Sequence, residues 1–360
     1  MQHTLLTPLT KGVYAFRNRV VMAPMNRRRA VDGVPGHAMA TYYHQRAGAG
    51  LIVTDNTAIA PNAIGYLNTP GLYTQAQRDG WKRIVETVHH ENGTIFIQLV
   101  HTGRIGHPAN HMGGLPLVGA SDRKANETVR TPTGHLPMPE PVVLTQPEVQ
   151  DLVALHVEAA AMAVALGFDG VEIHGAHGFL PEQFLNPQTN NRTDHYGGSL
   201  VKRSRFILEI MEGVVGAIGA ERTGIRLSPF ASVNDLSPYP DELETHRYLV
   251  NALAAMNIGF LHLSNQVVNG ISSIPHAYLI EVRRRFKNLL IFTGGNTRES
   301  AEQLIQSELI DLAGFGKPFI ANPDLPERFR HNAALAVPDD ATFYTEGDKG
   351  YTDYASFTTA

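Results

Sequence analysis

The chain has 360 residues, of which 43% are hydrophobic and 18% are charged, and its formal net charge is -4 at pH 7. This composition is typical of a folded globular protein, and the lack of a long basic run argues against nucleic acid or a membrane as a partner. The sequence contains no cysteine, which excludes disulfides, thiolate zinc sites, iron–sulfur clusters and a cysteine nucleophile.

The chain begins Met1-Gln-His-Thr, without the basic region and apolar stretch of a secretion signal, and no 18-residue apolar run follows. We therefore expect a soluble cytoplasmic protein that acts on small molecules.

Short runs of β-branched and other apolar residues predict eight strands, at 20–23, 51–54, 95–98, 170–173, 224–227, 260–263, 289–292 and 312–315. Between them, apolar residues at three- and four-residue spacing predict helices at 81–90, 148–166, 204–218, 248–256 and 301–309. The second helix is preceded by Thr145-Gln-Pro-Glu148, a capping-box pattern. Alternating strands and helices favour an α/β fold, a single (β/α)8 TIM barrel spanning residues 1–360. An open doubly wound sheet is the competing fold, but its glycine-rich turn after the first strand is missing.

One long segment interrupts the alternation, from about 101 to 144, and it is rich in Gly, Pro, His and Asn. Because it follows the third strand, it emerges on the face where barrels place their active sites. We expect a lid-like excursion over the pocket. We also expect the segment from about 335 to 360 to return to the active-site mouth.

Polar residues lie at the ends of most predicted strands, and they form a ring around one mouth of the barrel: Asn26, Asp55, Asn56, Gln98, His101, His174, His177, Arg226, Asn296 and Lys317. Glycines accompany the last two strands, at Gly294-Gly295-Asn296 and Gly316-Lys317, where barrels commonly bind phosphate through backbone N–H groups. This pattern predicts a phosphorylated ligand. Isolated turns and a solvated lysine are the alternative interpretation.

The pair His174 and His177 is open to three interpretations: a structural pair, a metal site or a clamp on a substrate oxygen. A metal site needs a third ligand, and Asp55 is the only acidic candidate at a neighbouring strand end. The adjacent Arg226 also disfavours a cation. We therefore predict no metal.

The segment Gly170-Val-Glu-Ile-His-Gly-Ala-His-Gly-Phe-Leu-Pro-Glu-Gln-Phe-Leu-Asn-Pro187, with its continuation at 191–199 and 203–209, resembles the signature of the Old Yellow Enzyme family of FMN-dependent ene-reductases. Further matches cover almost the whole chain, at 22–24, 65–66, 70–72, 98–104, 225–229, 314–316, 320–325 and 350–354. The set is most similar to the N-ethylmaleimide-reductase-like branch.

The resemblance implies a role for each matching residue. Those implied to contact the flavin are Pro24, Met25, Asn26, Asn56, Gln98 and Arg226, and those implied to hold the FMN phosphate are Gly295, Asn296, Gly316 and Lys317. His174 and His177 would polarise the substrate's carbonyl or nitro oxygen. Tyr66, Val100 and Tyr351 would line the substrate side, although ordinary packing at the mouth also explains the two tyrosines.

Four residues depart from the family pattern. Phe179 stands where relatives usually carry the tyrosine that protonates the substrate's α-carbon, and Asn26 stands where Thr or Cys usually contacts the flavin. Val100 replaces a common Trp, and Lys317 replaces the usual Arg. The implied proton delivery is therefore the main open point.

The resemblance implies an enzyme that takes hydride from NADPH or NADH and reduces activated C=C bonds in enones, maleimides or nitroalkenes, with the proton supplied by water or another group. Alternatives are an isomerase, a nitro or nitrate-ester reductase, or a flavin-binding protein with little turnover. We expect a monomer or homodimer.

Overall fold

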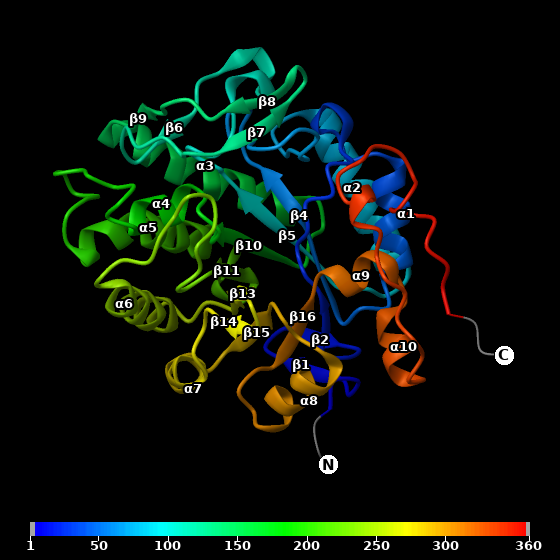
Figure 1. The fold of residues 1–360 in the computed structure, drawn as a ribbon. Helices are drawn as coiled ribbons and strands as arrows, with labels where there is room; N and C mark the ends of the chain where they lie inside the picture. Colours follow the sequence, from blue (N-terminus) through cyan, green and yellow to red (C-terminus); the bar gives the residue numbers. More distant parts are fainter. Residues whose placement is uncertain (1–3, 358–360) are drawn as a thin grey trace.

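The computed structural model describes residues 4–357. Eight parallel strands close into a barrel (Figure 1). They are β3 (Val20–Met22), β4 (Leu51–Ala58), β5 (Ile95–Val100), β10 (Gly170–Gly175), β11 (Thr223–Leu227), β12 (Phe260–Ser264), β15 (Leu289–Thr293) and β16 (Leu312–Phe315). Each predicted strand is present, and β16 pairs with β3 to close the ring. The barrel prediction is confirmed and the open sheet is wrong. Residues 1–3 and 358–360 lie outside the described residues. The predicted domain includes both ranges, and the predicted C-terminal segment includes 358–360.

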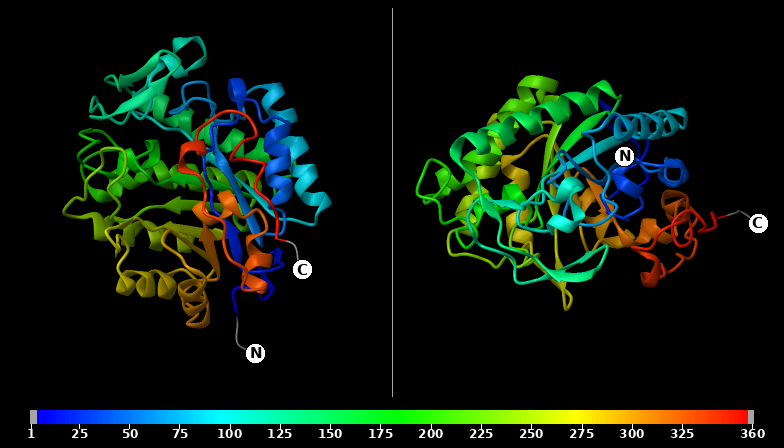
Figure 2. Two further views of the ribbon diagram at one scale, coloured as in Figure 1. Left: turned by 45° about the vertical axis from the view of Figure 1, so that its right-hand side comes forward. Right: turned by 90° about the horizontal axis from the view of Figure 1, so that it is seen from above.

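Helices surround the strands, as Figures 1 and 2 show from three sides. The longer ones are α1 (His37–Gln45), α2 (Gln75–His90), α3 (Gln146–Ala165), α5 (Leu200–Ile218), α6 (Glu242–Ala255), α7 (His276–Arg285) and α8 (Arg298–Gln306). All five predicted helices are present, and the capping box of Thr145 and Glu148 is confirmed. Helix α2 begins six residues earlier than predicted, because Thr74 and Gln77 form a second capping box there. Not predicted were α1, α7 and the short α4 (Leu180–Leu185), α9 (Lys317–Ala321) and α10 (Leu325–Arg330). None of the helices within residues 4–357 is long and apolar enough to cross a membrane.

The excursion after β5 stands out at the top of Figure 1. It contains four short strands, which were not predicted: β6 (Val118–Gly119), β7 (Thr128–Thr131), β8 (Gly134–Pro137) and β9 (Val142–Val143). Strands β7 and β8 form an antiparallel hairpin. Arg104 donates to the backbone oxygens of Asn234 and Asp235, so the excursion is tied to the loop that follows β11.

The lower end of the barrel is closed by a hairpin of β1 (Leu9–Lys11) and β2 (Tyr14–Phe16). Tyr14 and Phe16 pack with inward side chains of the strands, including Phe96 and Phe260. Side chains alternate along a strand, so residues two positions further along point inward at the next level. That level is polar and contains Gln98, Glu172, Arg226 and His262. The barrel therefore has an apolar floor below a charged layer.

The C-terminal segment, red in Figure 1, runs beside α1. The Tyr351 ring stacks on Tyr42 of α1, with the two centroids 4.1 Å apart. Arg27, just beyond β3, donates to the backbone oxygens of Phe343 and Gly350. These contacts hold the described part of the segment next to the first loop of the barrel mouth.

Candidate active site at the barrel mouth

A chain of hydrogen bonds crosses the barrel interior below the mouth. Gln98 donates its amide to one oxygen of Glu172 at 2.7 Å, and His262 Nδ1 lies 2.7 Å from the other oxygen. His262 Nε2 in turn lies 2.7 Å from the Thr293 hydroxyl. Glu172 and His262 are completely buried. This layer fixes the orientation of the Gln98 amide, whose carbonyl oxygen and second N–H remain available to a ligand above it.

Arg226 is buried beside this layer. Burial lowers the pKa of its guanidinium to about 10, and the nearby Glu172 carboxylate opposes that shift. The guanidinium stays charged at neutral pH because even the lowered pKa is far above 7. One terminal nitrogen donates to Ser264 at 3.1 Å, while Nε is buried and has no partner among the described residues. Arg226 thus presents an unused donor and a positive charge at the mouth.

His177 is held by three hydrogen bonds. Its backbone is in the left-handed region, with φ of 59°, and its N–H donates to Ser228 at 2.8 Å. Its carbonyl oxygen accepts from Asn234, and its Nε2 lies 2.8 Å from the Ser264 hydroxyl. Ser228 itself donates to Glu182, a carboxyl group whose pKa burial raises to about 7. Residues of neighbouring strands and loops therefore position the His177 ring through hydrogen bonds.

Ser264 links His177 to Arg226 and favours one tautomer. An arginine can only donate, so the Ser264 oxygen accepts from Arg226, and its own proton has His177 Nε2 as the only acceptor found among the described residues. When Nε2 accepts this proton, the proton of the neutral imidazole lies on Nδ1. We therefore expect His177 to offer an Nδ1–H donor.

His174 lies beside His177, with their rings edge to face and the centroids 5.3 Å apart. Neither ring nitrogen of His174 forms a hydrogen bond with a described residue, and Nδ1 is buried. Burial, followed by the partner histidine and Arg226, holds the pKa of His174 well below its usual range, and burial and Arg226 do the same for His177. Both imidazoles are therefore neutral near pH 7, and each has one N–H to donate.

An apolar wall stands next to the histidines. Phe179 packs edge to face on His174, with the centroids 4.8 Å apart, and belongs to a buried cluster with Val100 and the excursion residues Ile105, Ala125, Val129 and Met138. The Tyr66 ring lies 6.5 Å from Phe179, and its hydroxyl donates to Asn234. The excursion thus covers Phe179 and Val100, which carry no polar atom.

The flavin residues predicted on the first two barrel strands lie in the loop after β3 and at the bulge of β4. Pro24 and Met25 are half-buried in the loop after β3. The Asn26 amide donates to Thr69 at 2.7 Å, and its carbonyl accepts from the backbone of Arg28, so only one N–H of this side chain remains free. A register shift between Val53 and Asn56 places Asn56 opposite Gln98, and its side-chain oxygen is buried without a partner.

The same register shift determines the direction of the Asp55 side chain. Regular alternation from Val53 would point Asp55 inward, but the bulge turns it outward. It accepts from the Tyr43 hydroxyl at 2.6 Å and from the backbone N–H of Arg27. No group of three or more His, Asp or Glu side chains suited to a metal occurs within residues 4–357.

The predicted phosphate residues come together at the ends of β15 and β16. Gly294 and Gly295 have φ of 111° and 74°, and a Cβ on Gly294 would lie 1.9 Å from the Asn265 carbonyl oxygen. The Asn296 amide bridges the carbonyls of Phe292 and Gly314, which joins the two strands. Beside Gly316, a Cβ would meet nothing closer than Met25 at 3.5 Å. Lys317 is exposed.

Tyr351, predicted on the substrate side, is fully buried between Tyr42 and the guanidinium of Arg29, and its hydroxyl has no partner among the described residues. The residues that sequence reasoning missed are Ser264, Ser228, Asn234 and Glu182. Only Ser264 had a usable signal, since it follows Phe260 and His262 at two-residue spacing on an inward strand face.

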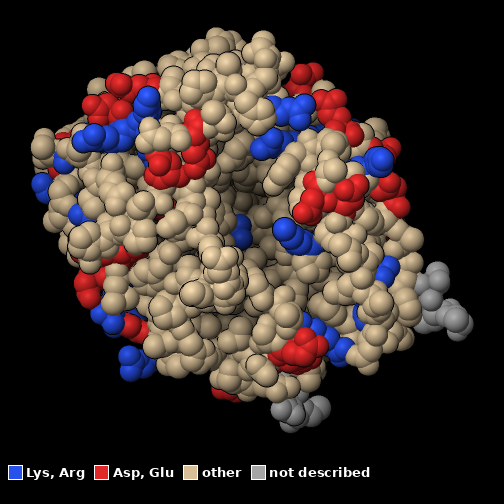
Figure 3. Space-filling model, in the orientation of Figure 1, with Lys and Arg blue, Asp and Glu red and all other residues tan. Residues whose placement is uncertain are grey.

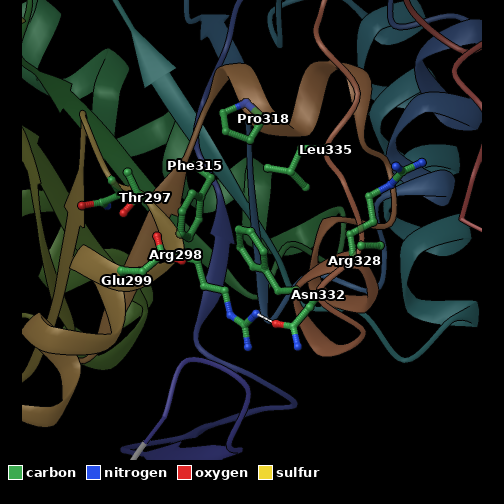
Figure 4. A pocket seen from close by; sticks show the side chains of 11 residues that line it. Thr297, Arg298, Glu299, Phe315, Pro318, Arg328, Asn332 and Leu335 are labelled. Carbon is green, nitrogen blue, oxygen red and sulfur yellow. Dashed lines mark hydrogen bonds between the residues drawn. The ribbon is translucent and has the colours of Figure 1, made fainter.

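The surface is hollowed over the barrel strands, with Lys or Arg side chains at the hollow (Figure 3). A pocket of about 490 Å³ lies between the start of α8 and α10, and its lining includes Asn296 (Figure 4). Its arginines are already engaged, because Arg298 donates to Asn332 and Arg328 to Asp324. The barrel mouth, not this pocket, gathers the polar groups that lack partners.

The chain is similar to known proteins over almost its whole length. The model of the NADH:flavin oxidoreductase / NADH oxidase family matches residues 4–336. 12-oxophytodienoate reductase 7 of Oryza sativa subsp. japonica is 37% identical over 374 residues, which cover 98% of this chain and 94% of that protein. The structure of morphinone reductase is 41% identical, with a TM-score of 0.95 over 99% of this chain and 97% of that one, and morphinone reductase is also known in complex with tetrahydroNAD. The Old Yellow Enzyme homologue from Zymomonas mobilis is 36% identical, with a TM-score of 0.93 over 98% of this chain and 99% of that one.

Proposed function

This chain belongs to the NADH:flavin oxidoreductase / NADH oxidase family, the Old Yellow Enzyme family, and is an FMN-dependent oxidoreductase with a nicotinamide hydride donor; on that premise we propose that it reduces activated C=C bonds. The proposed substrates are enones, maleimides and nitroalkenes. The observation that carries the proposal is the pair of neutral imidazoles, His174 and His177, at the end of β10.

The groups around the mouth fit FMN. Two buried polar atoms, Arg226 Nε and the Asn56 side-chain oxygen, have no protein partner. They lie on opposite sides of the Gln98 amide, of which one N–H donates to Glu172. This mixture of donors and acceptors suits the pyrimidine ring of a flavin. The space beside Gly316, which a Cβ could enter without a protein clash, suits a close approach of ligand to backbone. We assign Gly295, Asn296, Gly316 and Lys317 to the phosphate, and Pro24, Met25 and Asn26 to the flavin edge.

When bound, FMN supplies the hydride that it has received from NADH or NADPH. The chain's own contribution is to hold and polarise the substrate. His174 and His177 each donate one N–H to the carbonyl or nitro oxygen, which stabilises the negative charge that develops there as the β-carbon is attacked. Arg226, kept charged at the base of the mouth, favours negative charge on a bound flavin.

Phe179 has no proton to donate to the α-carbon. The Tyr66 hydroxyl already donates its proton to Asn234. Burial raises the pKa of this hydroxyl, which makes it a weaker acid. We therefore propose that water delivers the α-proton through the open mouth. A second candidate function is favoured by the apolar cluster around Phe179, which excludes water from that side: an isomerase or a nitro or nitrate-ester reductase needs no protonation at that carbon.

The test is anaerobic stopped-flow spectroscopy of the FMN-loaded protein. NADPH or NADH should bleach the flavin absorbance, and 2-cyclohexenone should restore it with formation of cyclohexanone. Rearranged alkene without net consumption of NAD(P)H would support the isomerase, and released nitrite from a nitrate ester would support the ester reductase. A flavin that is reduced by the donor but reoxidised by none of these compounds contradicts the proposed reactions.

A further inference from the structure

Three consecutive arginines follow β3, and they behave differently. Arg27 donates to the carbonyl oxygens of Phe343 and Gly350, and Arg29 donates to those of Gly347, Thr342 and Arg27. Both side chains are therefore used to hold the C-terminal segment. Arg28 differs, because its guanidinium forms no hydrogen bond with any described residue.

The Arg28 side chain is half-buried between two tyrosine rings. Its guanidinium carbon lies 4.8 Å from the Tyr66 centroid and 4.5 Å from the Tyr344 centroid. The Nε atom is buried and unpartnered. No carboxylate within residues 4–357 forms an ion pair with it, and the positive charge of Arg130 repels it. The positive charge is thus held in place and left without a counter-ion.

Arg28 is close to the reacting groups through a short series of contacts. Tyr66, which carries the guanidinium on one face, lies next to Phe179, and Phe179 packs on His174. The backbone N–H of Arg28 also donates to the Asn26 side chain at 2.9 Å. The unused donors therefore lie at the rim of the same mouth, on the substrate side.

We propose that Arg28 binds an anionic group, a carboxylate or a phosphate, on a ligand whose reacting end lies at His174 and His177. Arginine donates two parallel N–H groups to such an anion, and the two aromatic faces keep the guanidinium plane fixed and partly shielded from water. The proposal rests on the proposed reduction at the histidine pair. The anion has two sources, a carboxylate on the alkene or a phosphate of the nicotinamide donor.

The experiment uses the FMN-loaded enzyme and matched pairs of substrates. Cyclohexenones that carry a carboxyalkyl chain of increasing length at ring carbon 4 are each compared with their methyl ester. In Arg28→Met, which keeps an apolar stem between the tyrosines, the acid-to-ester ratio of kcat/KM should fall about 10- to 100-fold for the best chain length, as expected for the loss of a charge-assisted hydrogen bond. Arg28→Lys should restore part of that ratio, because it keeps the charge but loses the fork.

The nicotinamide arm measures the Kd of NADH and NADPH in flavin reduction. A loss confined to the acid substrates assigns the site to the alkene, and a loss confined to the nucleotides assigns it to the donor. Arg130→Met is the matched control: it removes a neighbouring exposed charge, and its effect should stay within about threefold because exposed charges are screened. Arg28→Met with no loss in either arm, or Arg130→Met with an equal loss, overturns the proposal.

A direct binding measurement separates this result from the proposed function. Each acid and ester is titrated into the oxidised enzyme, and its Kd is taken from the change in flavin absorbance. If neither compound is turned over, the alkene-reductase function fails, whereas the acid-to-ester ratio of Kd still reports on Arg28. FMN content and melting temperature of each variant exclude unfolding.

Discussion

At the ends of β10, β11 and β12 the barrel mouth is lined by side chains that hydrogen-bond to one another, whereas at the ends of β15 and β16 it is lined mainly by glycine backbone. On the first side, Ser264 joins His177 to Arg226, so the position and tautomer of one residue depend on its neighbours. On the second side, Gly294 and Gly316 have no side chain, and this leaves the backbone accessible. Side chains provide adjustable chemistry, and bare backbone provides close approach to a ligand.

The largest effect should come from removing an imidazole on the side-chain side. His174→Ala deletes one of two N–H donors to the substrate oxygen, and we expect kcat/KM for 2-cyclohexenone to fall about 10²- to 10³-fold. Flavin reduction and reoxidation are measured separately by stopped flow, with FMN content as the control. A loss smaller than about threefold in reoxidation would show that His174 does not contact the substrate.

The glycine side is tested by two alanine substitutions that should separate stability from binding. Gly294→Ala should destabilise even the protein without FMN, by at least about 1–3 kcal/mol, because φ is 111° and the new Cβ meets the Asn265 oxygen. Gly316→Ala meets no protein atom closer than 3.5 Å, so it should weaken FMN binding about tenfold with a smaller change in melting temperature. Thermal unfolding and FMN fluorescence titration measure the two effects. Equal behaviour of both variants would contradict the distinction.

Ser264 tests whether the side-chain network acts as a unit. Ser264→Ala removes the hydroxyl between Arg226 and His177, and we expect kcat/KM to fall up to about tenfold. Nitrogen-15 NMR of the histidine ring should show the His177 proton moving from Nδ1 toward Nε2, and Ser264→Thr should restore it. An unchanged tautomer in Ser264→Ala would mean that the hydroxyl only fills space.

Phe179→Tyr introduces a phenol beside His174 and should have a smaller effect. General acids contribute about 10²- to 10⁴-fold only where protonation limits the rate, and with water as the proton source we expect a gain of at most about tenfold in reoxidation. The solvent isotope effect on that step should fall as well. Unchanged rates with every enone tested would argue against any missing-acid effect.

The smallest effect should be that of pH on the histidine pair. The pKa values of His174 and His177 are lowered by burial, so the folded protein keeps both imidazoles neutral while the unfolded chain takes up protons below about pH 6.5. Stability should therefore fall as the pH drops below 6.5, whereas kcat/KM for flavin reoxidation by 2-cyclohexenone should show no inflection from either histidine between pH 6 and 8, the range in which the Glu182 carboxyl titrates. Denaturant titrations and initial rates check the two statements, and an inflection lost in His174→Ala would contradict the second.

Much of the fold was readable because the barrel repeats one local pattern. Each of the eight strands contains a short apolar run, and five helices have clear apolar spacing. The helix α1 was missed because its aromatic residues Tyr42 and Tyr43 are both buried, which hides the usual period. The excursion strands were missed because two- to four-residue strands carry too little pattern.

Site residues could be predicted from the sequence where their role depends on their position along a strand. They could not be predicted where their role depends on contacts between strands. His174 and Gln98 were found from their places at the ends of predicted strands, and Arg226 from its place within one. A bulge in β4, invisible in the sequence, decided that Asn56 faces the mouth and Asp55 faces Tyr43. Packing of segments far apart in the chain buried Tyr351 against Tyr42, away from solvent.

By itself the sequence determined the barrel, the family and the residue types at the mouth, because period-two and helical patterns and contiguous motifs are local properties of the chain. Only the tertiary structure decided which of those side chains are already engaged: Arg27 and Arg29 are, Arg28 is not, and Ser264 is shared between Arg226 and His177. Hydrogen-bond partners come from residues tens or hundreds of positions apart, and a donor's availability is set by closure of the barrel rather than by its neighbours in sequence.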